Sequence, residues 1–68
     1  MYIVIELQKT ADNVPVSNIV TSHENLAEAE SKYYSVLASA AISNVPVHSA
    51  IIVSEEGFPV RNQCYKHQ

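Results

Sequence analysis

The chain has 68 residues, of which 47% are apolar and 16% are charged, and its formal net charge is −3. This balance is typical of a single ordered domain spanning residues 1–68, since a disordered chain would show the opposite balance. A domain of this size hides only about 60% of the surface of its unfolded chain, so its stability usually needs a disulfide, a metal or self-association. With Cys64 as the single cysteine, an intramolecular disulfide is excluded. We therefore expect a homo-oligomer.

The distribution of charge and hydropathy excludes several classes of partner. Only four lysines and arginines are present, whereas nucleic-acid binding depends on clustered cations, so a nucleic-acid partner is not expected. No apolar stretch approaches the ~18 residues of a membrane span, and no basic segment precedes an apolar leader. We expect a cytoplasmic protein without a membrane partner.

The pattern of residues 1–21 predicts two strands. Residues 1–8 alternate two sets of side chains toward opposite faces: Ile3, Ile5 and Leu7 against Tyr2, Val4 and Glu6. Residues 9–13 have the composition of a turn, and residues 14–21 resume a β-like pattern. Pro15 lacks an amide donor, so it belongs at the start or the edge of that second strand.

Residues 25–43 form the only stretch with sustained helical spacing. The residues predicted to point inward share one side of this helix: Leu26, Tyr33, Leu37 and Ala40. Ser22 is a suitable N-cap, because its hydroxyl can accept a bond from a free helical amide. Asn44 can adopt the left-handed conformation that ends a helix, and Pro46 prevents its extension.

The second half after the helix predicts two further strands. Residues 47–54 are apolar on both faces, which is typical of a central strand, and residues 58–67 form the fourth strand after a turn with Gly57 at positive φ. The sequence therefore predicts an α+β fold, ββαββ in order, with a four-stranded antiparallel sheet and one helix on one face. We expect the sheet face away from the helix to be the subunit interface, formed by Tyr2, Val4, Ala50 and Ile52.

The chain carries no recognisable catalytic, phosphate-binding or metal-binding motif. The three histidines lack the spacing that brings two imidazoles to one metal, so we expect no metal, no cofactor and no enzymatic activity. Cys64 is interpreted as a buried or half-buried structural thiol. His48 lies on an otherwise apolar strand face, where it needs either a hydrogen-bond partner within the fold or a ligand. A small hydrolase that uses His48 or Cys64 is the remaining alternative.

Aromatic and basic residues provide the candidate binding site. The residues predicted to bind a ligand or partner are Tyr33, Tyr34, His48, Arg61, Tyr65 and Lys66. Aromatic rings can stack on a ligand and the cations can hold an anion or phosphate. Tyrosine and arginine also anchor protein contacts, so a small-ligand pocket and a protein interface are both consistent with this set.

Four stretches, residues 31–43, 47–50, 56–57 and 64–67, resemble a family of very small proteins from phages and mobile elements of Gram-positive gut bacteria. The resemblance implies a phage accessory protein in the cytoplasm of an infected or lysogenic host. From the resemblance we expect counter-defence, in which the protein binds and neutralises a host defence component or sequesters a nucleotide signal. The alternative is a structural or regulatory phage protein that acts through protein–protein contacts.

Overall fold

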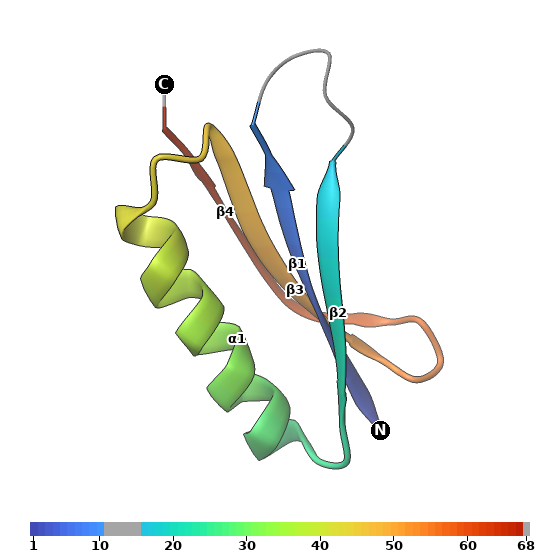
Figure 1. The fold of residues 1–68 in the computed structure, drawn as a ribbon. Helices are drawn as coiled ribbons and strands as arrows, with labels where there is room; N and C mark the ends of the chain where they lie inside the picture. The colour runs from blue at the N-terminus through green and yellow to red at the C-terminus, as the bar shows by residue number, and fades with distance from the viewer. Residues whose placement is uncertain (11–15, 68) are drawn as a thin grey trace.

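The computed structural model describes residues 1–10 and 16–67 and shows a helix packed on one antiparallel sheet (Figure 1). The elements are β1 (Tyr2–Lys9), β2 (Ser17–His23), α1 (Leu26–Ile42), β3 (Val47–Ser54) and β4 (Pro59–Lys66). The strand order is β2-β1-β3-β4, so the predicted ββαββ fold and the central position of residues 47–54 are confirmed. Most of the predicted turn at residues 9–13, together with Pro15, falls outside the described residues.

The core lies between α1 and one face of the two central strands. In the register of β1 and β3, Val4 is opposite Ile52, and both side chains are buried with neighbouring Ala50. From the helix, Ala29 and Tyr33 pack against them. The remaining buried residues of the helix are Val36 and Ala40, while Leu26 and Leu37 are partly buried at its margins. The predicted inward side of the helix is thus confirmed in outline.

The predicted subunit interface is wrong, because α1 covers the face to which it was assigned. Val4, Ala50 and Ile52 are at most 1% exposed within a single chain, and Tyr2 packs against them. Strand alternation groups residues by face but does not say which face a helix will cover. The small side chains Ala29 and Ala50, both buried, let the helix approach this face closely.

The ends of α1 differ from the predicted caps. The N-cap is Asn25, whose Oδ1 accepts a hydrogen bond of 2.9 Å from the Glu28 amide. Ser22 lies inside β2 opposite Ile3, where the sheet uses its backbone. At the other end, Ser43 has extended backbone angles and its amide donates to the Ala40 carbonyl. No described residue other than glycine has positive φ, so the left-handed cap at Asn44 is also wrong.

The β3–β4 turn follows the prediction. Gly57 has φ of +92°, a conformation that glycine adopts without a steric cost, and its amide donates to the Ser54 carbonyl. Pro59 opens β4 at the edge of the sheet, where a missing amide donor removes no bond from a central ladder. The register shifts between Ile52 and Val53, and the turn bends away from α1 (Figure 1).

Ile52→Ala tests the position of the core. Ile52 is fully buried, so we expect its truncation to lower the free energy of unfolding by about 2–4 kcal/mol, measured by urea unfolding followed by circular dichroism. Ile52→Val should cost about 1 kcal/mol and remains measurable if the alanine variant does not fold. Ile42→Ala is the matched control, since Ile42 is 86% exposed and its truncation should change stability by less than about 0.5 kcal/mol. Equal losses at Ile42 and Ile52 would contradict this packing.

Candidate functional site

The helix and strand β4 bring part of the predicted binding set together. Arg61 is opposite the buried Ile52 and Tyr65 is opposite the buried His48, so both side chains lie on the face that α1 covers. From the helix, Glu30 reaches β4, where its Oε2 accepts a hydrogen bond of 2.9 Å from Arg61 Nε. This pair ties the edge strand to the side of the helix that also carries Tyr34.

The two consecutive tyrosines of α1 differ in their exposure to solvent. Tyr33 is buried, whereas Tyr34 is 52% exposed, and their rings meet edge to face with centroids 5.2 Å apart. Burial raises the pKa of the Tyr33 hydroxyl, the neighbouring Tyr34 and Tyr65 raise it further, and the positive charge of Arg61 acts in the opposite direction. Tyr33 therefore belongs to the core and supports Tyr34, which is available for contact.

We define the α1–β4 surface as Tyr34, Arg61 and Tyr65. Arg61 is exposed, and its guanidinium has a raised pKa, first because of its hydrogen bond to Glu30. Tyr65 is half-buried and stacks on His67, with ring planes only 3° apart. The surface offers aromatic faces, hydroxyls and a guanidinium that uses one N–H on Glu30, which are the groups that bind aromatic, amide and carboxylate partners.

His48 and Lys66 do not join this surface. Lys66 is opposite Val47 and follows Tyr65 directly, so strand alternation places it on the other face of the sheet. His48 is 4% exposed and lies under the helix. Arg61 is therefore the cation of the α1–β4 surface among the described residues, since Lys32 lies about 200° around the helix from Tyr34. A negative partner, Glu30, already neutralises part of its charge.

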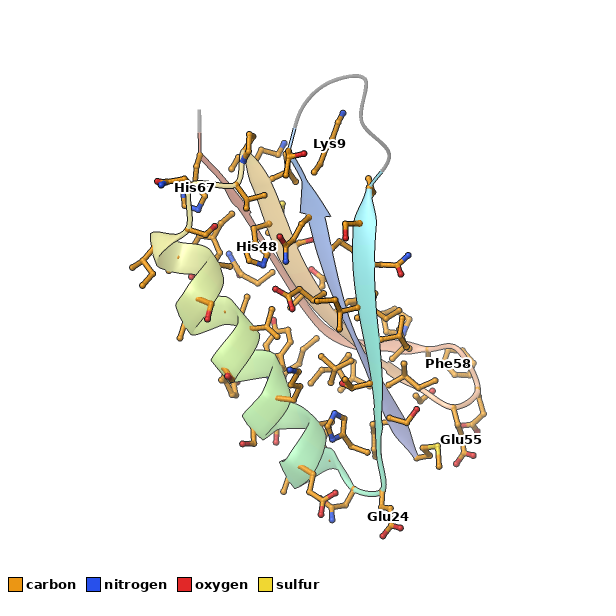
Figure 2. The ribbon with its side chains drawn as sticks, viewed as in Figure 1. Lys9, Glu24, His48, Glu55, Phe58 and His67 are labelled. Atoms are coloured by element: carbon orange, nitrogen blue, oxygen red, sulfur yellow. The ribbon has the colours of Figure 1, made fainter. Side chains whose placement is uncertain are left out.

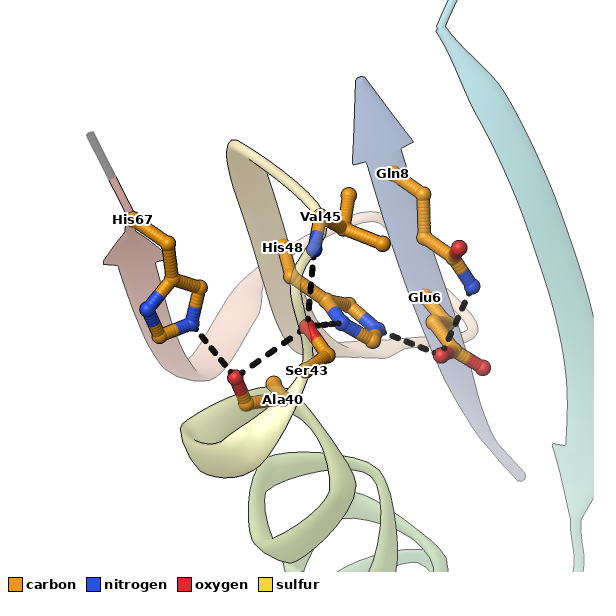
Figure 3. A network of polar contacts seen from close by, with 7 residues as sticks. All are labelled: Glu6, Gln8, Ala40, Ser43, Val45, His48 and His67. Carbon is orange, nitrogen blue, oxygen red and sulfur yellow. Dashed lines mark hydrogen bonds and ion pairs between the residues drawn. The ribbon is translucent and has the colours of Figure 1, made fainter. Parts of the chain in front are cut away.

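His48 is held by hydrogen bonds at both ring nitrogens (Figure 3). Its Nε2 is 2.6 Å from Glu6 Oε2, and its Nδ1 is 3.0 Å from Ser43 Oγ. Gln8 Nε2 donates to the same Glu6 oxygen over 3.1 Å. A buried imidazole with two partners needs no ligand, so the structure favours the structural role over the ligand-binding role for His48.

Ser43 lets this network accommodate either form of the histidine. When His48 is neutral with its proton on Nε2, the Ser43 hydroxyl donates to Nδ1. When both nitrogens carry protons, Nδ1 donates to Ser43, whose own proton then turns to the Ala40 carbonyl. The serine also accepts a bond from the Val45 amide. Although Ser43, His48 and Glu6 are connected in the order of a catalytic triad, these bonds hold the connection between α1 and β3 together.

His67 makes a second contact with the end of the helix, and the sequence did not predict this contact. Its Nε2 donates to the Ala40 carbonyl over 2.7 Å, and its amide donates to Pro46. Histidines near a helix C-terminus can satisfy its free carbonyls, but nothing local in the sequence places residue 67 beside residue 40. The Glu6–His48 pair had a clearer signal, because each is an isolated polar residue on an apolar strand face.

Cys64 and the acidic residues provide no further site. Cys64 is exposed, so its interpretation as a buried or half-buried thiol is wrong; it lies opposite Ser49 on the face away from α1. Among the described residues, no group of three His, Cys, Asp or Glu side chains is arranged to hold a metal ion. Across residues 1–10 and 16–67, no helix has the length and apolar character needed to cross a membrane.

Comparison of the chain with models of protein families, with curated proteins and with solved structures finds no match. The resemblance to small phage proteins thus stays an expectation based on the stretches quoted for it. The geometry of the α1–β4 surface and of the His48 network is independent of that resemblance.

Tyr33→Phe tests the pKa of the buried tyrosine. Because the pKa is higher in the folded chain than the ordinary value of 10.0, the hydroxyl contributes stability that is complete below that value and is lost as pH rises through the folded pKa. We expect the free energy of unfolding of the wild type to fall as pH rises above about 10, and that of Tyr33→Phe to fall less. Tyr34→Phe should fall between the two, because Tyr34 is itself one cause of the raised pKa of Tyr33. Parallel pH profiles for all three proteins would contradict the assignment.

Glu6→Ala tests the buried polar network. Without its carboxylate partner, the His48 ring loses a charge-assisted hydrogen bond beneath the helix, so we expect the free energy of unfolding to fall by about 1.5–3 kcal/mol. The control is Glu24→Ala, because Glu24 is an exposed carboxylate in the turn before α1 and its loss should cost less than about 0.5 kcal/mol. Urea unfolding measures both; equal effects would show that the Glu6–His48 contact does not stabilise the fold.

Proposed function

We propose that the protein is a non-catalytic accessory protein of the phage type that binds another protein through its α1–β4 surface. The observation that carries the proposal is the exposed ring of Tyr34, placed beside Arg61 and Tyr65 on one side of the molecule. Tyrosine and arginine are the residues that most often dominate the energy of protein interfaces. Each chain would occupy a surface of its target and block it.

The electrostatics of this surface favour a protein over a nucleotide signal. A nucleotide carries at least one phosphate, which binds most strongly where several cations or free backbone amides converge. Here Arg61 shares its charge with Glu30, and Lys66 lies on the opposite face of the sheet. A protein partner needs only matched hydrogen bonds and a ring for Tyr34 to pack against, which this surface can supply.

Fixed side chains support a binding role. Tyr34 rests against Tyr33, Arg61 is held by Glu30, and Tyr65 stacks on His67. Side chains that are already ordered lose less conformational entropy when a partner binds, so a small surface can give useful affinity.

The three histidines, which could support catalysis, are engaged in hydrogen bonds within the fold. His48 bonds to Glu6 and Ser43 beneath the helix, and His67 bonds to the end of α1. This supports action by binding rather than turnover. Within that class, we propose counter-defence: neutralisation of a host defence component in the cytoplasm of an infected or lysogenic cell by a protein that self-associates. A structural or regulatory phage role would use the same surface on a phage partner.

Tyr34→Ala combined with Arg61→Ala tests the binding surface. Both side chains are about half exposed, and an exposed ion pair contributes little stability, so the double variant should fold. Native mass spectrometry of the protein recovered from infected cells should show the wild type with a second protein at fixed stoichiometry. The double variant should lose that protein, with affinity reduced by about 100-fold or more. Ile42→Ala, an exposed position about 12 Å further along the helix, should retain it.

The mass and identity of the retained molecule separate the alternatives. A host defence protein supports counter-defence, whereas a phage protein supports the structural or regulatory role. A bound mass in the range of a nucleotide would overturn the protein partner in favour of signal sequestration. Repeated recovery of the bare chain, or equal retention by the wild type and the double variant, would contradict the proposed surface.

A further inference from the structure

The face of the sheet away from α1 is apolar along its centre. By strand alternation and register, its central side chains are Ile3, Ile5, Leu7, Ile51 and Val53, with Val20 on the neighbouring edge strand. We call this set the open face, because in Figure 1 no described element lies over it. Ser22, Ser49 and Asn62 border the apolar centre. A large aliphatic surface of this kind on a small domain marks a contact with another macromolecule.

Charge is divided between the two ends of the open face. At one end, Lys9 and Lys66 lie on either side of Val47 in the register of the three strands. The opposite end carries the β3–β4 turn, where Glu55 and Glu56 are exposed; the N-terminal amine pairs with Glu55 over 3.1 Å, so Glu56 supplies the net negative charge. Figure 2 shows Lys9 and Glu55 at these two ends. The open face therefore has a positive end and a negative end.

The size of the open face matches the requirement of a small dimer. Four strands of seven or eight residues, with a rise of about 3.4 Å per residue and a spacing of about 4.8 Å, cover about 500 Å². Two such faces together bury about 1,000 Å², the lower limit for a specific protein interface. The β3–β4 turn bends to this side of the sheet and adds Phe58, which is 69% exposed.

We propose that two copies of the chain pack their open faces together about a two-fold axis that runs across the strands. An axis along the strands would place the Lys9–Lys66 end of one copy on the same positive end of the other. An axis across the strands reverses the second copy, so that β4 lies over β4 and Lys66 meets the negative turn of the other chain. Opposite charges then meet at both ends of an apolar centre, which satisfies area and charge together.

This dimer deepens the self-association in the proposed function and does not use the α1–β4 surface. Light scattering and sedimentation should show a dimer of the wild type at micromolar concentration. Ile51→Lys places a charge in the apolar centre and should weaken dimerisation by about 100-fold or more, while circular dichroism stays unchanged. Ile42→Lys, on the exposed side of α1, should remain dimeric. If Ile51→Lys does not fold, Val20→Lys replaces it, because Val20 is 57% exposed on the edge strand.

A charge exchange tests the direction of the axis. Lys66→Glu should weaken the dimer by about tenfold, and adding Glu56→Lys should restore it. With the axis along the strands, Lys66→Glu would instead strengthen the dimer, which would overturn the proposed geometry. A wild type that is monomeric, or equal dissociation by Ile42→Lys and Ile51→Lys, would overturn the dimer itself. The two proposals fail separately, since a monomeric Ile51→Lys should still bind its partner and the Tyr34→Ala, Arg61→Ala variant should still dimerise.

Discussion

The contact between Glu6 and His48 constrains the rest of the structure. It joins residues 42 positions apart on the two central strands, and Ser43 extends it to the end of α1. An imidazole that is 4% exposed cannot be left without partners, because an unpaired buried polar group costs more than a hydrogen bond gains. The helix end, β1 and β3 therefore have to meet at one place, which sets the position of α1 along the sheet.

This requirement also accounts for the side of the sheet that α1 covers. The covered face carries His48, whose Nε2 is paired by Glu6 within the sheet but whose Nδ1 is paired by Ser43 at the end of the helix. It also carries Ala50, which leaves room for the small residues of the helix. The open face has larger aliphatic residues, Ile3, Ile5 and Ile51, but no polar group that needs the helix. The helix thus covers the face where it pairs a buried polar group and can approach the sheet closely, although the other face carries larger aliphatic side chains.

The sequence predicted the elements better than the relations between them. Periods of 2.0 and 3.6 residues are local, so they identified β3 and the interior of α1, and Gly57 and Pro59 marked the last turn by their backbone chemistry. Which face of the sheet the helix covers depends on tertiary packing, and strand alternation does not reveal it. The face that was predicted as the subunit interface is therefore part of the core. The candidate site shows the same limit. Tyr34, Arg61 and Tyr65 form one surface, whereas His48 and Lys66, which were predicted to join them, lie beneath the helix and on the other face of the sheet. His67 beside Ala40 required the assembled fold.

The two proposed surfaces belong to different sides of the same sheet, and this has a consequence for their combined use. The α1–β4 surface lies on the helix side, while the open face is on the other side. In the proposed dimer the open faces meet at the centre, so both helices and both copies of Tyr34 point outward. Each partner-binding surface stays free, and a target with two or more identical sites would be bound twice. The second binding event is then intramolecular, which raises the overall affinity without any new contact. A chain of 68 residues can place only a few residues in each interface, so it gains most from such an arrangement.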